Sequence, residues 1–208
     1  MGDAITPFLD ATILAEWDIT PAELSEIIRE NPSIRGMVFG YVAEYKLRKL
    51  WFKDRPGVSH FVKHDDHNRK KKGDLVVTYK GLEFSFESKS VQTNTVRRTN
   101  KGGFFAKVQC DGSDRRQVSF PDGTILQTTC LLRGQFDILA VNLFEFEKTW
   151  RFIFAKNKDL PPNTYKKYTA AQQALLLPSL MPVTWPLTAP YCDEPFSLMD
   201  ELIADYHS

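Results

Sequence analysis

Apolar residues in the first quarter of the chain recur at helical spacing. Thr20-Pro21-Ala22-Glu23 combines an N-cap residue, a proline at the first helical position and an acid at the third, which predicts a helix that ends before Asn31-Pro32. A second helix is expected over 33–52, so N-terminal helices occupy 20–53. The apolar positions expected to form a buried stripe on the second helix are Ile34, Met37, Val38, Tyr41, Val42 and Tyr45.

The pattern changes to an alternation of apolar and polar residues after residue 73. Residues 73–90 are rich in β-branched and aromatic side chains on either side of Lys80-Gly81, a pair that suits a two-residue hairpin loop. We therefore predict an antiparallel hairpin over 73–90. Pairing outward from its loop places Asp74 directly opposite Glu87.

Further strand-like runs occupy 104–155, with a turn at Pro121-Asp122-Gly123. The run 136–144 is apolar almost throughout, so we expect a central strand that is buried on both faces. Asp137 opens this run, and we expect it to cap the strand or to pair with Arg133. The expected strands are 104–110, 117–120, 124–132, 136–144 and 150–155.

The last part of the chain, 175–208, is rich in proline before it becomes acidic. Five prolines between Pro178 and Pro195 prevent a regular helix and favour an extended strap. Residues 195–206 then return to helical spacing. We expect this short acidic helix to cap the core of its own domain. Docking on a second subunit and covering a basic cleft are the alternatives.

Length and composition suit one compact domain over 1–208. The chain is 42% hydrophobic and can bury a substantial core, for which a single α/β domain is the default. No apolar run approaches the roughly 18 residues that a membrane span needs, and the N-terminus lacks the basic start of a signal peptide. The three cysteines show no CxxC spacing, so we expect reduced thiols and a cytoplasmic protein without membrane association.

Positive charge is concentrated in the middle of the chain. The formal net charge is only +1, but residues 46–116 hold 18 bases and 8 acids, a local net charge of +10. A basic zone of this kind attracts the phosphates of nucleic acids. The alternative is a solvated, lysine-rich surface.

Three side chains of the predicted hairpin converge within this basic zone. Directly opposed residues of antiparallel strands have Cβ atoms about 4.5–5.5 Å apart, so Asp74 and Glu87 are near enough to hold one divalent cation. Lys89 lies two residues beyond Glu87 and therefore projects from the same face.

Asp74, followed on the next strand by Glu87-Ser88-Lys89, resembles the signature of the PD-(D/E)xK nuclease superfamily, which includes many type II restriction endonucleases. The likeness spans about 33–155, and Gly73 replaces the usual proline before the first acid. It implies a restriction-endonuclease-like α/β fold with a central mixed β-sheet flanked by helices. It also implies that Asp74, Glu87 and the Ser88 carbonyl bind Mg²⁺, which Mn²⁺ can replace, while Lys89 orients or deprotonates the attacking water.

A second acid-x-lysine match, Glu44-Tyr45-Lys46, falls in a helical stretch without an acidic partner strand. In many relatives of the superfamily a helix glutamate reaches the metal through water, and the resemblance implies this role for Glu44. The alternative is a solvated position on the flank of the helix.

Polar and basic segments on both sides of the hairpin are the candidate contacts to DNA. Residues 60–72 contain three histidines and two aspartates, but they read as a polar loop and not as an ordered zinc site. Residues 90–103 lack apolar periodicity and suit a loop or short helix over a phosphate backbone. The candidate DNA-binding residues are Lys70, Lys71, Lys72, Gln92, Arg97, Arg98, Arg115 and Arg116.

The resemblance and the charge pattern together predict a Mg²⁺-dependent endonuclease that acts on double-stranded DNA, in its best form a type II restriction endonuclease. A homodimer is expected because a double-strand break needs two active sites. The alternatives are a repair, recombination or mobile-element nuclease of the same fold, and a non-catalytic DNA-binding module.

Overall fold

The computed structural model describes residues 12–63 and 73–206 of the chain. It divides into two compact units, Met1–Val42 and Ala43–Ser208, and each is described here by itself. The single domain expected over 1–208 stays a prediction. Lys70, Lys71 and Lys72 lie outside the described residues.

The first unit is helical, with α1 (Ile13–Glu16), α2 (Pro21–Glu30) and the start of α3 (Pro32–Leu47). The predicted capping box is present. The Glu23 backbone N–H donates to the Thr20 hydroxyl at 3.2 Å, and the Glu23 carboxylate accepts from the Thr20 backbone N–H at 2.8 Å. Two backbone donors at the start of α2 are thereby satisfied.

The apolar stripe expected to be buried along α3 is exposed, and this expectation was wrong. Met37 is 61% and Tyr45 is 52% exposed, whereas Ala43 and Leu47 are the buried residues of α3. Helical spacing shows which residues share a face, but it does not show whether another element covers that face. The chain continues from α3 into a short π-helical turn, η1 (Arg48–Phe52).

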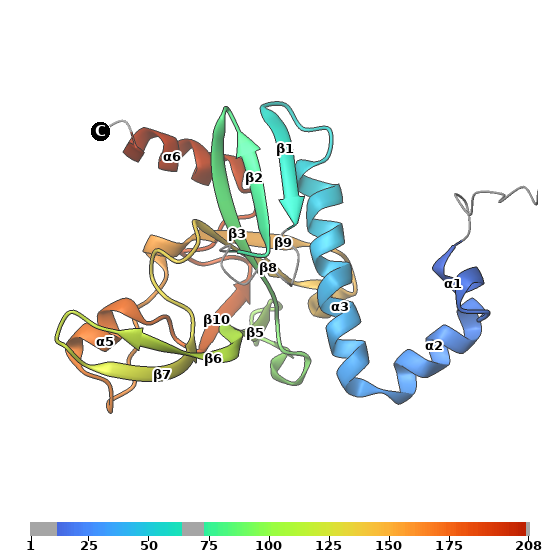
Figure 1. Ribbon diagram of the computed structural model, residues 1–208, viewed down its shortest axis with the longest axis horizontal. Coiled ribbons are helices and arrows are strands. Elements are labelled where there is room, and N and C mark those ends of the chain that lie inside the picture. Colours follow the sequence, from blue (N-terminus) through green and yellow to red (C-terminus); the bar gives the residue numbers. More distant parts are fainter. Residues whose placement is uncertain (1–11, 64–72, 207–208) are drawn as a thin grey trace, which may run out of the picture. The chain divides into compact units, whose positions relative to one another are not determined.

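The second unit is a mixed α/β structure built on a five-stranded sheet with the order β1-β2-β3-β8-β9 (Figure 1). Strands β3 and β8 are parallel, and the other neighbouring pairs are antiparallel. The predicted fold class, a central mixed sheet flanked by helices, is confirmed. The strands are β1 (Val58–Lys63), β2 (Leu75–Tyr79), β3 (Leu82–Ser90), β8 (Ile138–Asn142) and β9 (Phe152–Lys156).

The β2–β3 hairpin has the predicted register. Tyr79 pairs with Leu82 and Leu75 pairs with Phe86 across the ladder. Both loop residues have positive φ, 49° at Lys80 and 82° at Gly81. Two successive residues with positive φ match the right-handed twist of the flanking strands.

Two apolar cores lie on the two faces of this sheet. One face packs on η1 and on the C-terminal helix α6 (Phe196–Tyr206), through residues such as Phe52, Phe86 and Met199. The other face packs on a three-stranded sheet with the order β10-β5-β4. All five residues of β8 are buried, which confirms the predicted central strand. The strands of the second sheet are β4 (Arg97–Arg98), β5 (Phe104–Gln109) and β10 (Leu180–Trp185).

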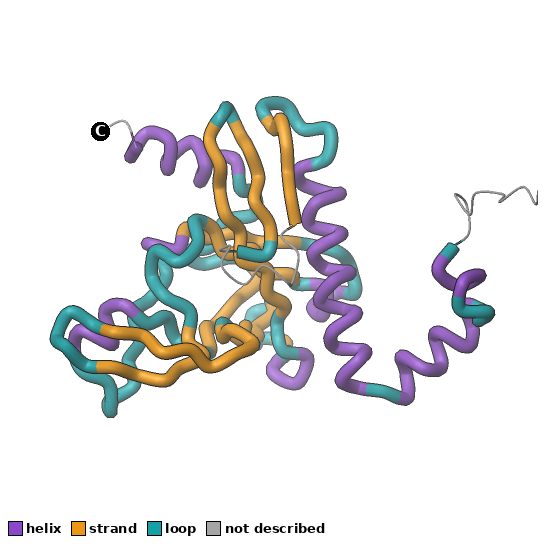
Figure 2. The backbone as a smooth tube through the Cα atoms, viewed as in Figure 1, coloured by secondary structure: helices purple, strands orange, loops and turns teal. Residues whose placement is uncertain are grey.

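The remaining strands, β6 and β7, form a separate two-stranded ladder. Figure 2 shows all strands in orange. The predicted turn at 121–123 connects β6 to β7, and Gly123 has a φ of 78°. The remaining elements are β6 (Asp111–Ser119), β7 (Ile125–Cys130), η2 (Thr93–Thr95), α4 (Phe144–Glu147), η3 (Asn157–Asp159) and α5 (Ala170–Leu175).

Two expectations for local structure need correction. Residues 60–63 were expected in a loop but form part of β1, because pairing with β2 gives their backbone groups partners. Arg97-Arg98 pairs with β5 as a short strand and is not a loop. The proline-rich segment is extended where it forms β10, as expected, and Pro182 is tolerated there because β10 is an edge strand.

The C-terminal helix covers its own core, as expected. Leu198 and Met199 are buried, and the Phe196 ring lies 5.4 Å from the Tyr79 ring. Among the described residues, we find no helix with the length and apolar character that crossing a bilayer requires.

Asp137 joins β8 to β3 through Ser85. Its Oδ2 accepts hydrogen bonds from the Ser85 backbone N–H and hydroxyl, both at 2.7 Å. Of the two expected roles, capping of the strand is confirmed and pairing with Arg133 is wrong, since the Arg133 guanidinium donates to the carbonyls of Lys158 and Leu160. Asp137 therefore acts as a charged acceptor at the start of the central strand.

We predict that Asp137→Ala lowers the free energy of unfolding by roughly 2–3 kcal/mol, because two hydrogen bonds to a charged acceptor are lost. Ser85→Ala, which removes one of the two donors, should cost less. Urea unfolding followed by circular dichroism measures both. An unchanged stability in Asp137→Ala would show that these hydrogen bonds do not hold the strand.

Candidate active site

The candidate site lies where the β2–β3 hairpin opens. Asp74 directly precedes β2, and its backbone N–H donates to the Phe86 carbonyl at 2.8 Å. Continuing the observed register places Asp74 opposite Glu87. Both side chains therefore point away from the core that contains Leu75 and Phe86, towards the face that packs on the second sheet.

The backbone conformation of Gly73 explains why proline does not precede Asp74 in this chain. Its φ is 78°, a value that proline cannot reach because its ring fixes φ near −65°. A Cβ atom at this position would lie 2.9 Å from the Phe86 carbonyl oxygen. Glycine therefore permits the close backbone approach that brings Asp74 against β3.

Asp74, Glu87 and Lys89 converge as the sequence predicts. The Ser88 backbone N–H donates to Asp74 Oδ2 at 2.7 Å, and Lys89 Nζ lies 2.8 Å from Glu87 Oε1. Glu87 is only 8% exposed. Two carboxylates and one ammonium group thus share a largely enclosed place on one face of the sheet.

The pKa of Glu87 is raised by the surroundings of its carboxyl group. Burial is the largest cause, and the negative charge of Asp74 adds to it. The positive charges of Lys89 and Arg116 act in the opposite direction without cancelling the rise. A divalent cation between Asp74 and Glu87 would relieve the repulsion and favour the ionised form of Glu87.

Lys89 is held in its protonated form. Burial lowers its pKa, but the charges of Glu87 and Asp74 and the hydrogen bond to Glu87 outweigh that effect, so the net pKa is raised. At neutral pH the side chain is therefore an ammonium group. It can donate hydrogen bonds and offset negative charge, but it has no lone pair with which to accept a proton.

Behind Lys89 lie two side chains that are uncharged at neutral pH, Cys110 and Tyr191. Burial raises the pKa of the Cys110 thiol to about 12, although the nearby Lys89 charge lowers it. Burial also raises the pKa of Tyr191, whose hydroxyl lies near Cys110. These two residues were missed by sequence reasoning, because Cys110 only ends a strand pattern and Tyr191 lies in the proline-rich segment.

The donor set suits magnesium. In residues 12–63 and 73–206 there is no cluster of three or more histidine, cysteine, aspartate or glutamate side chains that could hold a metal. Magnesium is usually held by one or two carboxylates, with water and substrate phosphate completing its shell. Asp74, Glu87 and the Ser88 carbonyl therefore fit this ion and do not make a closed zinc site.

Arg116 has an internal role in addition to the predicted contact with DNA. Its guanidinium donates to Gln135 Oε1 at 2.5 Å and to the Cys130 carbonyl at 3.1 Å. Its charge also lowers the pKa of Glu87. Arg116 thereby connects the β6–β7 ladder with the candidate site, while its neighbour Arg115 is exposed.

The other predicted DNA contacts lie on exposed or half-buried positions. Arg97 and Arg98 are exposed, and their guanidinium groups lie over the rings of Phe105 and Phe104 at 4.4 and 4.9 Å. Gln92 donates to Gln109 Oε1 at 2.8 Å. A role in DNA binding stays a prediction for all of these residues.

Glu44 pairs with Lys63 at 2.8 Å. Lys63 is opposite Leu75 in the sheet and therefore lies on the Leu75 face, away from Glu87. The ion pair supplies the cation that a mostly buried carboxylate needs. A catalytic role for Glu44 stays a prediction, and the contact observed for it is with β1.

The solved structure of a bacterial homing endonuclease, I-Ssp6803I, is similar to this chain at 13% sequence identity. The similarity covers 65% of this chain and 85% of that chain, with a TM-score of 0.35. No protein-family model and no curated protein matches the sequence. A similarity of this size supports no assignment, so the function proposed below rests on the chain's own residues.

We predict that Asp74→Asn lowers the pKa of Glu87 in the metal-free protein, because the charge of Asp74 is one of the causes that raise it. Carboxyl NMR signals followed across a pH titration measure this shift. Asp54→Asn, an exposed position on the surface, is the matched control and should leave the titration unchanged.

Magnesium, like the substitution Asp74→Asn, should lower the pKa of Glu87. A cation held by both carboxylates favours the ionised form, so adding Mg²⁺ to the wild-type protein lowers the pKa of Glu87. The effect should weaken in Asp74→Asn. If Mg²⁺ leaves the pKa of Glu87 unchanged in the wild type, this carboxylate is excluded as a ligand.

The Glu44–Lys63 pair yields a separate prediction. If Glu44 acts only through this pair, Glu44→Gln and Lys63→Met should each lower the free energy of unfolding. The double variant should then lose less free energy of unfolding than the two single losses added together. DNA cleavage should match the wild type at limiting Mg²⁺. Reduced cleavage in Glu44→Gln but not in Lys63→Met would instead assign Glu44 to the metal site.

Proposed function

We propose that this chain is a Mg²⁺-dependent endonuclease of the PD-(D/E)xK superfamily that hydrolyses phosphodiester bonds of DNA. One observation carries the proposal: Asp74, Glu87 and Lys89 meet on one face of the β2–β3 hairpin, with Glu87 in contact with Lys89 at 2.8 Å and repelled by Asp74. Glu87 is buried, and its pKa stays raised by burial and by the charge of Asp74 although Lys89 is beside it, so a further cation next to both carboxylates would stabilise the ionised form.

In this proposal Asp74, Glu87 and the Ser88 carbonyl hold Mg²⁺. When bound, the ion supplies a Lewis acid and an activated water for attack on phosphorus. The Ser88 backbone N–H fixes the Asp74 carboxylate through its 2.7 Å hydrogen bond. Because that hydrogen bond uses Oδ2, it also orients the remaining oxygen of Asp74.

Lys89 is proposed to stabilise negative charge on the phosphate and to position the water. The raised pKa of Lys89 favours these roles over deprotonation of the water. The enclosed surroundings strengthen the effect, since the interaction between charges grows as water is excluded. Cys110 and Tyr191 contribute to this exclusion as neutral groups at the back of the site.

The DNA surface is proposed to come from the basic zone 46–116, which has a net charge of +10. Its described arginines Arg97, Arg98 and Arg115 are exposed and can reach phosphates. Lys70, Lys71 and Lys72 belong to the same proposed surface.

More specifically, we propose that the enzyme is a cytoplasmic type II restriction endonuclease that acts as a homodimer on double-stranded DNA. Repair, recombination or mobile-element nucleases would use the same residues. A non-catalytic binding module is the remaining alternative, but a module that only binds has no chemical reason to combine two carboxylates and a lysine in one enclosed place.

We predict that Asp74→Ala and Glu87→Ala each abolish Mg²⁺-dependent cleavage of plasmid DNA. Lys89→Ala should lower the rate by about 10²–10³-fold, because it removes one stabilising donor. DNA affinity, measured by fluorescence anisotropy with Ca²⁺ in place of Mg²⁺, should be kept or should rise in the two acid variants, since a negative charge that faces phosphate is gone.

Lys148→Gln is a matched control for the loss of a positive charge, because its ammonium group is already paired with Glu145. It should cut DNA like the wild type. Wild-type cleavage rates in Asp74→Ala or Glu87→Ala would overturn the proposed function, and DNA binding without any cleavage by the wild type would favour the non-catalytic module.

A further inference from the structure

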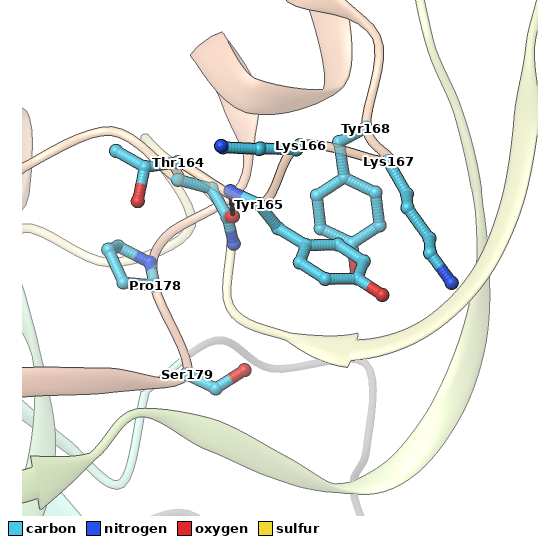
Figure 3. Close-up of a pocket in the computed structure, with 8 residues that line it drawn as sticks. Thr164, Tyr165, Lys166, Lys167, Tyr168, Pro178 and Ser179 are labelled. Carbon is cyan, nitrogen blue, oxygen red and sulfur yellow. Dashed lines mark hydrogen bonds between the residues drawn. The ribbon is translucent and has the colours of Figure 1, made fainter.

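A basic and aromatic pocket lies in the second unit, outside the candidate active site. It is formed by residues 163–168 together with Pro178 and Ser179 (Figure 3). Figure 3 shows the rings of Tyr165 and Tyr168 next to each other, with Lys166 and Lys167 extending to opposite sides of them. None of the pocket's eight lining residues is acidic.

The backbone of this pocket is fixed, while its main aromatic side chain is left in solvent. The Tyr165 N–H donates to Asn163 Oδ1 at 2.9 Å, and the Tyr165 carbonyl accepts from Tyr168 N and Gln173 Nε2. Asn163 itself is buried and donates to the Leu177 carbonyl. Tyr165 is nevertheless 52% exposed. A ring on a fixed backbone loses little conformational entropy when a ligand stacks on it.

The positive charge of the pocket is not neutralised by the protein. Lys166 and Lys167 are exposed, and within the described ranges neither forms an ion pair. Some other lysines of the second unit are paired, such as Lys156 with Glu201 and Lys158 with Asp205. The pocket therefore offers two ammonium groups to an anionic ligand.

One backbone hydrogen bond connects a residue that lines the pocket with Cys110, which lies beside Lys89. The carbonyl of Ser179, a lining residue, accepts a hydrogen bond from the Cys110 backbone N–H at 2.8 Å. The thiol of Cys110 lies beside Lys89, whose charge lowers its pKa. Cys110, the residue that follows β5, thus contacts Ser179 through its backbone N–H and lies beside Lys89 through its thiol.

We propose that this pocket binds an unpaired nucleotide of the DNA substrate, outside the bond that is cut. Lys166 or Lys167 contacts its phosphate, and its base stacks on Tyr165. A nucleotide uses both the charge and the exposed ring, whereas an acidic peptide would use only the charge. This inference rests on the proposed function, which it deepens by adding recognition of an unpaired nucleotide beside the duplex that is cut.

The test compares two probes, a blunt DNA duplex and the same duplex with an unpaired thymidine extension, by fluorescence anisotropy in Ca²⁺. The wild type should bind the extended duplex more tightly. Tyr165→Ala should weaken that binding by about 5–150-fold, the range for loss of one stacked base. Tyr165→Phe keeps the ring and should bind like the wild type.

Replacing both lysines in Lys166→Gln/Lys167→Gln should weaken binding of the extended duplex and reduce its salt dependence by about one unit of slope per lost phosphate contact. Lys148→Gln should change neither. Thermal melting of each variant confirms that these exposed substitutions leave the fold intact.

The two proposals can fail separately. If the wild type cuts DNA with Mg²⁺ but Tyr165→Ala and the double lysine variant bind the extended duplex like the wild type, the pocket proposal is overturned and the proposed function stands. If the wild type neither binds nor cuts either probe, the proposed function fails and the pocket proposal fails with it.

Discussion

The pairing of β2 with β3 is the constraint on which the site depends. The two-residue loop Lys80-Gly81 fixes which residues face each other, and Phe84 and Phe86 fix which face is buried. A shift of the register by one residue would turn those rings towards the other face. The same shift would separate Asp74 from Glu87. The apolar core around Phe84 and Phe86 therefore determines the position of the charged residues on the opposite face of the sheet.

The enclosed charges work against the stability that the core supplies. Glu87 is buried near Asp74, which raises its pKa, and Lys89 offsets only part of the repulsion. Buried like charges of this kind are typical of active sites. Their repulsion in the free protein can be relieved when a metal ion and a substrate bind. Asp137 shows the contrast. It lies on the same sheet, but its hydrogen bonds to Ser85 satisfy it within the fold.

Local signals were sufficient for the hairpin and the site, and tertiary contacts explain what they missed. The turn chemistry of Lys80-Gly81 and the period of the strands give the register, from which Asp74, Glu87 and Lys89 follow. The exposure of Met37 and the internal hydrogen bonds of Arg116 depend instead on elements distant in sequence. Cys110 and Tyr191 behind Lys89 were missed for the same reason. They lie in segments far apart in the sequence, and no local pattern connects the two segments.

The acidic C-terminal helix illustrates how the fold separates charges that nearly cancel in the whole chain. Its Asp200, Glu201 and Asp205 pair with Lys80, Lys156 and Lys158. Its apolar side packs on the core that contains Phe86, on the face of the sheet opposite Glu87. The helix therefore does not cover the candidate site in this structure. Because its acids are paired with lysines on that face, the protein keeps exposed arginines such as Arg97 and Arg98 although its net charge is only +1.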